Sequence, residues 1–377
     1  MTLNRRTLLT AAAAAPLAGH AARAQTATVK IGVLNDQSGV YRDISGPTSV
    51  ACVKQAVEEF ASKGFAVEVL SGDHQNKPDV GTTIARQWID RDGVDMIIDV
   101  ANSGVALAIN AVCRDKDRAY INSTGAAMVK SGGDSWFFIT ADYAFGTALE
   151  RDTTNFVKQA GGRVLGSVRH PFPGNTDFSS FLLQAQASKA KVVGICNAGT
   201  DTVNTIKQAA EFGLTRSGVK LAGLLVFIND VHALGLEAAQ GLVLTESFYW
   251  DLNDRTRAFT KRVLPKTGGA HPAMSHAGCY AGALHYLKAV ADMGVAEAKK
   301  SGAATVTRMK AMPTDDDCFG AGTIRADGRK VHPVYLFEVK KPSESKAPWD
   351  YYKLIATTPA DQAFRPLNEG GCALVHA

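Results

Sequence analysis

Residues 95–127 read DMIIDVANSGVALAINAVCRDKDRAYINSTGAA, and this stretch decides the fold. Its hydrophobic pattern predicts a β-α-β unit made of a strand over 96–100, a polar turn over 101–104, a helix over 105–116, a strand over 119–121 and a polar turn over 122–127. Both turns follow the carboxyl ends of strands. Because ligands bind at the carboxyl ends of strands in an open α/β sheet, the unit predicts the fold class and also the edge that holds a site.

The two polar turns predict a ligand cradle. The first contributes Asn102 and Ser103, and the second contributes Ser123 and Thr124. The first turn also opens a helix, whose backbone N–H groups and dipole favour an anion. Capping of the helix and of the second turn explains either turn alone equally well. Two such turns, one β-α-β unit apart, favour binding over capping.

The first 24 residues have the pattern of an export signal. Arg5 and Arg6 form a short basic head, residues 8–17 are apolar, and small residues end the segment at Ala24. The apolar run is too short to span a membrane, so we expect a signal that is cleaved after Ala24 and not an anchor. The arginine pair is compatible with twin-arginine export. The mature chain, of a length usual for two domains, is expected outside the cytoplasm.

Composition and charge exclude two classes of partner. Hydrophobic residues make up 46% and charged residues 20%, which is ordinary for a globular protein. Loss of the signal lowers the formal net charge from +5 to +2, because Arg5, Arg6 and Arg23 leave with it. The remaining basic residues form no tract interleaved with aromatic residues, so nucleic acid is not expected as a partner. No second apolar run predicts membrane insertion.

The cysteines argue against a metal or redox motif but leave the disulfide pattern open. No two of them stand in a C-x-x-C arrangement. In an oxidising compartment one or two disulfides would be expected, yet six cysteines allow 15 complete pairings. Buried, inert thiols are the alternative. The six are Cys52, Cys113, Cys196, Cys279, Cys318 and Cys372.

Strands and helices alternate along most of the chain, which predicts parallel sheets and two doubly wound lobes. The expected strands cover 29–34, 66–70, 96–100, 119–121, 136–139, 164–169, 192–196, 220–226 and 242–250. The expected helices cover 48–62, 78–91, 105–116, 143–159, 178–188 and 202–212, with a mainly helical stretch from 255 to 310. Residues 319–326 and 331–339 are expected to form a hairpin around Asp327-Gly328. The tail from Lys340 is expected to be a loop.

No pattern of residues demands an enzyme. The chain has no G-x-S-x-G elbow, no H-E-x-x-H and no Walker loop. Three clusters of titratable residues are better explained as solvated loops or core packing than as a base, a nucleophile pair or a cation site. They are His74 beside Asp73, His271 and His276 near Cys279, and the acidic run 315–317. We therefore expect no catalytic residues, no metal and no cofactor.

Seven short stretches, in this order, carry a resemblance to a known family. They are IGVLNDQSGVYRDISG, GDHQNKP, INSTGAA, ADYAFG with GG at its helix end, PGNTDFSSFL, GICNAGTDTVNTIKQAAEFGL and FGAGTIRADGRKVHPVYLFEVK. The chain resembles the periplasmic substrate-binding proteins of the branched-chain amino-acid (leucine/isoleucine/valine-binding) type, which are the receptor components of ABC importers. The resemblance covers nearly the whole mature chain.

The resemblance implies the architecture and the partners. It implies a type I periplasmic binding protein fold, in which two Rossmann-like lobes are joined by a three-crossover hinge and close around a ligand. The first lobe would comprise residues 25–141 and 252–331, and the second residues 142–251 and 332–377. The protein would be a periplasmic monomer that delivers its ligand to a membrane permease and its ATPase.

The resemblance also implies a set of cleft residues. In the amino-acid binders, the positions that match Ser103, Thr124 and Ala126 hold the ligand carboxylate, with Asn102 in the same turn. Tyr143 matches an aromatic residue that faces the cleft. Asn197 and Ala198 match a second-lobe turn where an aromatic residue is common.

One departure from the family pattern bears on the ligand. Amino-acid binders place an acid in the second lobe to pair with the ligand ammonium, and that position falls near Leu225. A buried ammonium without a counter-charge would cost several kcal/mol. We therefore expect a carboxylate with an apolar body, such as a benzoate or a hydroxycinnamate. Aromatic walls for it would come from Tyr41, Tyr143, Phe227 and Phe248, with core packing as the alternative for these side chains.

Two alternatives stay open. The protein could be a branched-chain amino-acid binder whose acid is Asp230 or Asp201. It could also be a ligand-sensing domain that docks on a signalling partner instead of a permease.

Overall fold

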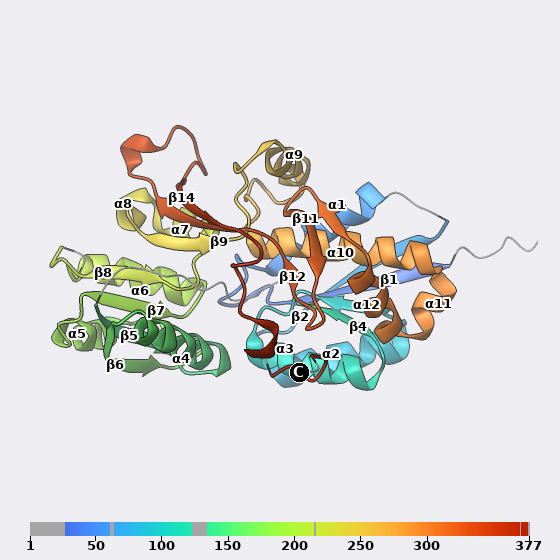
Figure 1. The fold of residues 1–377 in the computed structure, drawn as a ribbon, viewed down its shortest axis with the longest axis horizontal. Helices are drawn as coiled ribbons and strands as arrows, with labels where there is room; N and C mark the ends of the chain where they lie inside the picture. The colour runs from blue at the N-terminus through green and yellow to red at the C-terminus, as the bar shows by residue number, and fades with distance from the viewer. Residues whose placement is uncertain (1–26, 61–63, 123–133, 215, 370, 376–377) are drawn as a thin grey trace, which may run out of the picture.

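The computed structural model describes residues 27–375 apart from 61–63, 123–133, 215 and 370, and it shows two lobes side by side (Figure 1). The predicted export signal lies outside the described residues. Within them, no helix is long and apolar enough to cross a membrane. Strands alternate with helices in both lobes, which confirms the predicted α/β class.

The first lobe is built on a four-stranded parallel sheet in the order β2-β1-β3-β4. Parallel neighbours cannot be joined by a tight turn, so a helix connects each pair. The strands are β1 (Thr28–Asn35), β2 (Ala66–Asp73), β3 (Met96–Ile98) and β4 (Ala119–Ile121). The connecting helices are α1 (Gly46–Phe60), α2 (Pro78–Gln87) with a following turn of π-helix (Trp88–Asp92), and α3 (Ser103–Asp115).

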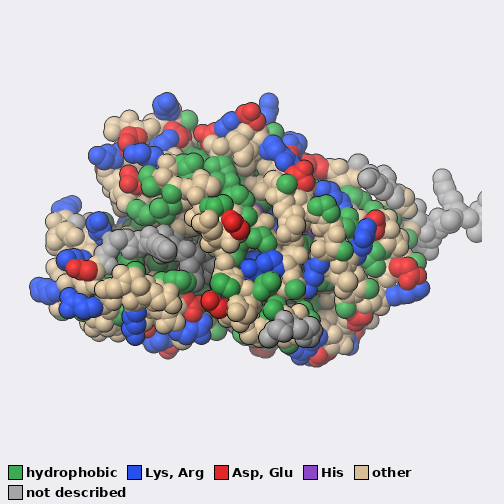
Figure 2. Space-filling model, in the orientation of Figure 1, with side chains coloured by type: hydrophobic (Ala, Val, Ile, Leu, Met, Phe, Trp, Pro, Cys, Tyr) green, Lys and Arg blue, Asp and Glu red, His purple; other side chains and the backbone are tan. Residues whose placement is uncertain are grey.

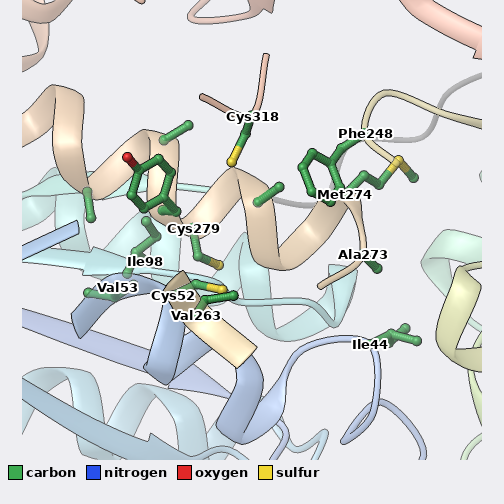
Figure 3. Close-up of a cluster of buried hydrophobic side chains, with 14 of the residues drawn as sticks. Ile44, Cys52, Val53, Ile98, Phe248, Val263, Ala273, Met274, Cys279 and Cys318 are labelled. Atoms are coloured by element: carbon green, nitrogen blue, oxygen red, sulfur yellow. The ribbon is translucent and has the colours of Figure 1, made fainter. Parts of the chain in front are cut away.

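Alternation along β3 explains why helices cover both faces of this sheet. Met96 and Ile98 are buried in the core formed with α1 and α10, whereas Ile97 is buried in the core formed with α2 and α3. Successive side chains of a strand point to opposite faces, so a strand that is apolar throughout needs a cover on each side. Figure 3 shows part of the first core, where Cys52 of α1 and Cys279 of α10 (Met274–Met293) lie near Cys318.

The second lobe is built on a seven-stranded sheet in the order β14-β13-β9-β8-β7-β5-β6, in which β13 runs antiparallel to both of its neighbours, β9 and β14. The strands are β5 (Ser135–Ala141), β6 (Arg163–His170), β7 (Val192–Cys196), β8 (Lys220–Gly223), β9 (Val243–Glu246), β13 (Val334–Val339) and β14 (Tyr352–Thr358). The helices are α4 (Ala144–Gln159), α5 (Ser179–Ala187), α6 (Thr200–Glu211), α7 (Ile228–Leu234) and α8 (Leu236–Ala239).

The chain passes between the lobes three times. It leaves the first sheet after β4, returns to the first lobe after β9, and joins the second sheet again at β13. Between the second and third passages it forms α9 (Asp254–Val263), α10, α11 (Val295–Lys300), α12 (Gly302–Ala311) and a small antiparallel sheet of β10 (Thr314–Asp316), β11 (Gly320–Ile324) and β12 (Lys330–Val331). Three passages agree with the predicted three-crossover arrangement.

Three local predictions are corrected. The hairpin around Asp327-Gly328 exists, but β11 pairs only with the short β12, and Val334–Val339 pairs instead with β9 and β14 in the other lobe. The tail after Lys340 contains the strand β14 and is not a loop throughout. Ser135–Ala141 was assigned to the first lobe, yet it pairs with β6 and β7 in the second sheet. These assignments depend on which strands pair with each other, and the local sequence pattern does not indicate the pairing.

All six cysteines are free thiols, and five of them are buried. Burial raises the pKa of the Cys52 and Cys318 thiols, which keeps them protonated and unreactive. Of the two alternatives left open by the sequence, the structure contains inert, buried thiols.

Candidate functional site

A loop between β1 and α1 carries Tyr41 from the first lobe to the boundary with the second. Asp36 holds this loop, because its carboxylate accepts hydrogen bonds from the backbone N–H of Gly39 and of Tyr41, both at 2.8 Å. The backbone oxygen of Tyr41 accepts a bond from the Ser45 hydroxyl at 3.0 Å. Local bonds to one buried carboxylate therefore fix the position of Tyr41.

Three aromatic rings meet at the boundary between the lobes. Tyr143 precedes α4 in the second lobe, and its hydroxyl contacts the hydroxyl of Tyr41. Phe172, in the loop after β6, stacks on Tyr143 with ring centroids 4.1 Å apart and lies 5.5 Å from the ring of Tyr41. Burial raises the pKa of both phenols, so the hydroxyls stay protonated and can donate hydrogen bonds. We call Tyr41, Tyr143 and Phe172 the aromatic bridge.

Phe172 was missed by the sequence analysis. It stands in the segment Pro171-Phe172-Pro173, and flanking prolines are a signal for an ordered loop. That signal does not reveal the partners of the ring, because Tyr41 and Tyr143 lie far away in the sequence.

The turn between β7 and α6 touches the same loop of the first lobe. Gly199 has φ +61°, and a Cβ there would lie 2.3 Å from the backbone oxygen of Val40. The N–H of Thr200 donates to that oxygen at 3.2 Å. The close approach of the two backbones requires glycine at position 199.

The hydrogen-bonding groups of the Asn197 side chain are used within the second lobe. Its side-chain oxygen accepts from the Thr202 hydroxyl at 2.7 Å, and its amide group lies 3.1 Å from the Thr205 hydroxyl and 3.3 Å from Nε2 of His170. Ala198, the next residue, is buried. In this conformation Asn197 positions the start of α6, and its side chain has no remaining group for a ligand.

Asp201 is a buried acid at the start of α6. Its side chain is 1% exposed, and Oδ2 has no hydrogen-bond partner in the structure. Burial raises the pKa of Asp201 to about 7. Asp201 directly follows Gly199 and Thr200, which contact the backbone of Val40 beside Tyr41, and its charge contributes to the raised pKa of Tyr41 and of Tyr143. The sequence analysis named Asp201 only as an alternative ammonium partner.

Asp230, the other acid considered, already has a partner. Its Oδ2 accepts from the backbone N–H of Phe227 at 2.9 Å, which caps α7. It lines a pocket of about 160 Å³ between the lobes, to which the first lobe contributes Val40 and Asp43 and the second contributes Gly199, Thr200, Val203, Asn229, Asp230 and Ala233. On the face shown in Figure 2, hydrophobic side chains gather where the two lobes meet.

The first-lobe cradle is described only in part. The Oδ1 of Asn102 accepts from the N–H of Val105 at 3.1 Å, so this side chain caps α3 as the capping interpretation expects. Ser103 is half-buried in the first turn of α3. Thr124 and Ala126 lie outside the described residues.

The remaining candidates pack in hydrophobic surroundings. Phe227 and Phe248 are fully buried, and Phe248 makes edge-to-face contact with Phe259 at 5.9 Å. Leu225 is half-buried against the same core. For Phe248, core packing accounts for the contacts seen. Among the described residues no group of three or more His, Cys, Asp or Glu side chains is placed to hold a metal ion.

Comparisons with known proteins identify relatives of this two-lobed chain. A sequence model described as Periplasmic binding protein matches residues 28–127 and 117–346. The crystal structure of a periplasmic binding protein from Burkholderia mallei is 45% identical, with 92% of this chain and 99% of that chain covered and a TM-score of 0.85. A search of curated proteins finds no match.

Two further structures differ in what their descriptions name. One, from Burkholderia xenovorans, is described as a branched-chain amino acid ABC transporter periplasmic ligand-binding protein, with 39% identity, 92% and 99% coverage and a TM-score of 0.77. The other, a solute-binding protein of an ABC transporter from R. palustris in complex with 4-hydroxybenzoate, is 21% identical, with 88% and 97% coverage and a TM-score of 0.78. At that identity the second likeness concerns the fold alone.

Proposed function

Since the chain belongs to the periplasmic binding protein family, whose members are solute-binding receptors of ABC transporters and not enzymes, we propose that it binds a small carboxylate between its two lobes. The family implies export to the periplasm and delivery of the ligand to a membrane permease with its ATPase. The preferred ligand class is an aromatic acid, such as a benzoate or a hydroxycinnamate.

The aromatic bridge is the observation that carries this proposal. Tyr41 reaches the boundary from the first lobe, while Tyr143 and Phe172 reach it from the second. A flat, apolar ligand ring can be enclosed by such side chains when the lobes close, and offset stacking adds about 0.5–1.5 kcal/mol to the burial of the ring. The carboxylate would lie at the turn that begins with Asn102 and Ser103, where the α3 N-terminus favours an anion.

A branched-chain amino acid is the second candidate. It is supported by the buried carboxylate of Asp201 beside the aromatic bridge and by the description of the 39% identical relative from Burkholderia xenovorans. Leu225 offers no counter-charge for an ammonium. Asp201 is therefore the residue on which the amino-acid alternative depends.

A thermal-shift screen of residues 25–377 tests the proposal. The panel comprises benzoate, 4-hydroxybenzoate, a hydroxycinnamate, leucine, isoleucine, valine and urea. A ligand present at 100 times its dissociation constant adds about 2.7 kcal/mol to the free energy of unfolding, which raises the midpoint visibly. Shifts with aromatic acids and none with leucine are expected. A shift with leucine alone would select the second candidate, and no shift with any carboxylate would contradict the proposal.

A further inference from the structure

The second lobe leaves the Asp201 carboxylate without the hydrogen bonds that a buried acid requires. Asp201 lies in the first turn of α6 with 1% of its surface exposed, and its Oδ2 has no partner in the structure. A buried polar atom without a partner is unfavourable, and native proteins rarely contain one that nothing else satisfies. Such an atom beside a ligand cleft indicates an interaction that is completed by the ligand.

His170 does not supply the missing hydrogen bond. Its Nδ1 lies 3.9 Å from Oδ2 of Asp201, which is too long for a hydrogen bond, but only 3.0 Å from the backbone oxygen of Pro171. Its Nε2 faces the amide group of Asn197 at 3.3 Å. The proton therefore belongs on Nδ1, where it is donated to Pro171. Burial lowers the pKa of His170, so the ring is neutral and gives Asp201 no counter-charge.

Asn197 and Thr205 also form their hydrogen bonds with groups other than the Asp201 carboxylate. The Thr205 hydroxyl donates to the backbone oxygen of Asp201 at 2.7 Å and must accept from the amide of Asn197 at 3.1 Å. The other amide hydrogen of Asn197 points to Nε2 of His170, and its oxygen accepts from Thr202. This closed network fixes the Asn197 orientation and leaves no donor for Asp201 from that side.

The aromatic bridge lies on the other side of Asp201. The acid contributes to the raised pKa of both Tyr41 and Tyr143, whose hydroxyls contact each other. Asp201 is thus an acceptor on the second lobe beside the rings of the proposed cleft, whereas the α3 turn proposed for the ligand carboxylate belongs to the first lobe.

We infer that Asp201 selects ligands that carry a hydrogen-bond donor at the end opposite their carboxylate. The inference rests on the proposed function. The para hydroxyl of 4-hydroxybenzoate is such a donor, whereas the ammonium of an α-amino acid is bonded to the carbon next to the carboxylate and is not. A site built to hydrogen-bond a ligand group rejects the analogue that lacks it, because its own buried polar atom is then left unpaired.

Isothermal titration of the whole mature chain with two matched pairs tests the inference. The first pair is 4-hydroxybenzoate and benzoate, and the second is leucine and 4-methylpentanoate, which lacks only the ammonium. We expect 4-hydroxybenzoate to bind at least about 10-fold more tightly than benzoate. A preference for leucine over 4-methylpentanoate alone would place the acceptor beside the ligand carboxylate and would overturn the inference.

Asp201→Leu removes both carboxylate oxygens and links that preference to the residue. It should bring the dissociation constants of 4-hydroxybenzoate and benzoate to within about threefold, with little change for benzoate. Glu246→Gln, which alters a buried acid that does not line the pocket between the lobes, is the comparison and should keep the preference. Thermal midpoints of both variants check that they are folded.

The outcomes distinguish failure of the inference about Asp201 from failure of the proposed function. If benzoate and 4-hydroxybenzoate bind the wild-type chain equally, the inference is overturned while the proposed function stands, with no need of a variant. If the preference persists in Asp201→Leu, or is lost in Glu246→Gln instead, another residue supplies the acceptor and the inference is wrong. If no carboxylate binds, both the inference and the proposed function are wrong.

Discussion

At the scale of single residues, the ring of Phe172 lies against side chains from both lobes. It stacks on Tyr143, 4.1 Å away and nearly parallel, and lies 5.5 Å from Tyr41 on the opposite lobe. Polar neighbours such as Asn102 and Asn197 are occupied by bonds within their own lobes. At the aromatic bridge itself, the polar groups left to meet a ligand are the phenol hydroxyls of Tyr41 and Tyr143.

Phe172→Ala should weaken ligand binding by about 1–2 kcal/mol, or roughly 10-fold, because it removes the stacked ring that holds Tyr143 in place. The measurement is the dissociation constant of the tightest ligand found in the screen. Phe212→Ala, which removes a surface ring that is 41% exposed at the end of α6, is the control and should leave affinity unchanged. Equal affinities of Phe172→Ala and wild type would remove this ring from the site.

At the scale of elements, the sequence predicted what depends on local pattern and missed what depends on partners. The β-α-β unit over 95–127 is present as β3, α3 and β4, because apolar strands and a capped helix are encoded within a few residues. Val334–Val339 was expected to complete a hairpin, but it crosses to pair with β9. The aromatic bridge joins segments that are about 30 to 130 residues apart, so no periodicity could predict it. Thr124 and Ala126 remain predictions.

Gly199→Ala should oppose closure of the lobes. Alanine is strained at φ +61°, and its Cβ would meet the backbone oxygen of Val40 across the boundary at 2.3 Å. We expect affinity to fall at least about 10-fold, which corresponds to about 1.4 kcal/mol. The control is Gly213→Ala at the end of α6, where φ is +70° but no atom lies within 4 Å of the new Cβ. Gly199 has ψ −136°, outside the left-handed helical region, so Gly199→Ala bears at least the strain of about 1–2 kcal/mol that a left-handed residue bears, in addition to the contact with Val40.

A loss of affinity in Gly213→Ala as large as that in Gly199→Ala would mean that backbone strain, and not the contact between lobes, is responsible. Titration of both variants with one ligand decides between these explanations. Small-angle scattering of the ligand-saturated proteins adds a direct readout, because Gly199→Ala should keep a larger radius of gyration than Gly213→Ala.

At the scale of the whole molecule, buried acids stand where the two lobes are joined. Glu246, at the end of β9, accepts from the Tyr352 hydroxyl of β14 at 2.7 Å and from the backbone N–H of Met274 at 3.4 Å, where α10 begins. It therefore ties the second sheet to the long helix of the first lobe. Burial raises the pKa of Glu246 to about 8, and that of Asp201 and Asp230 to about 7. Such groups are neutral acids near pH 6 and become buried charges above it.

These acids predict that the free energy of unfolding falls between pH 6.5 and pH 8. Each has a higher pKa in the folded protein than in the unfolded chain, so its stabilising contribution is complete below the unfolded pKa and is lost as the pH rises through the folded pKa. Buried His74, His271 and His276 act in the opposite sense, since burial lowers the pKa of each to about 4 and their contribution is lost only as the pH falls from about 6.5 to 4. Below pH 6.5 the two groups largely offset each other, and above it the ionisation of the acids in the folded protein outweighs the loss of the last protons from the histidines of the unfolded chain.

Urea unfolding of the ligand-free protein at pH 6.5 and pH 8 should therefore differ by about 1–3 kcal/mol, with the lower stability at pH 8, because one shifted group contributes at most about 1.4 kcal/mol per pH unit and the histidines offset part of the change. Glu246→Gln should reduce that difference by about 1–2 kcal/mol, because glutamine keeps an acceptor for Tyr352 and does not titrate. A difference in Glu246→Gln as large as that of the wild type would show that Glu246 is already ionised at pH 6.5. In that event the connection between β9, β14 and α10 would be made by a buried charge, and the loss of stability above pH 6.5 would have to come from Asp201 and Asp230 alone.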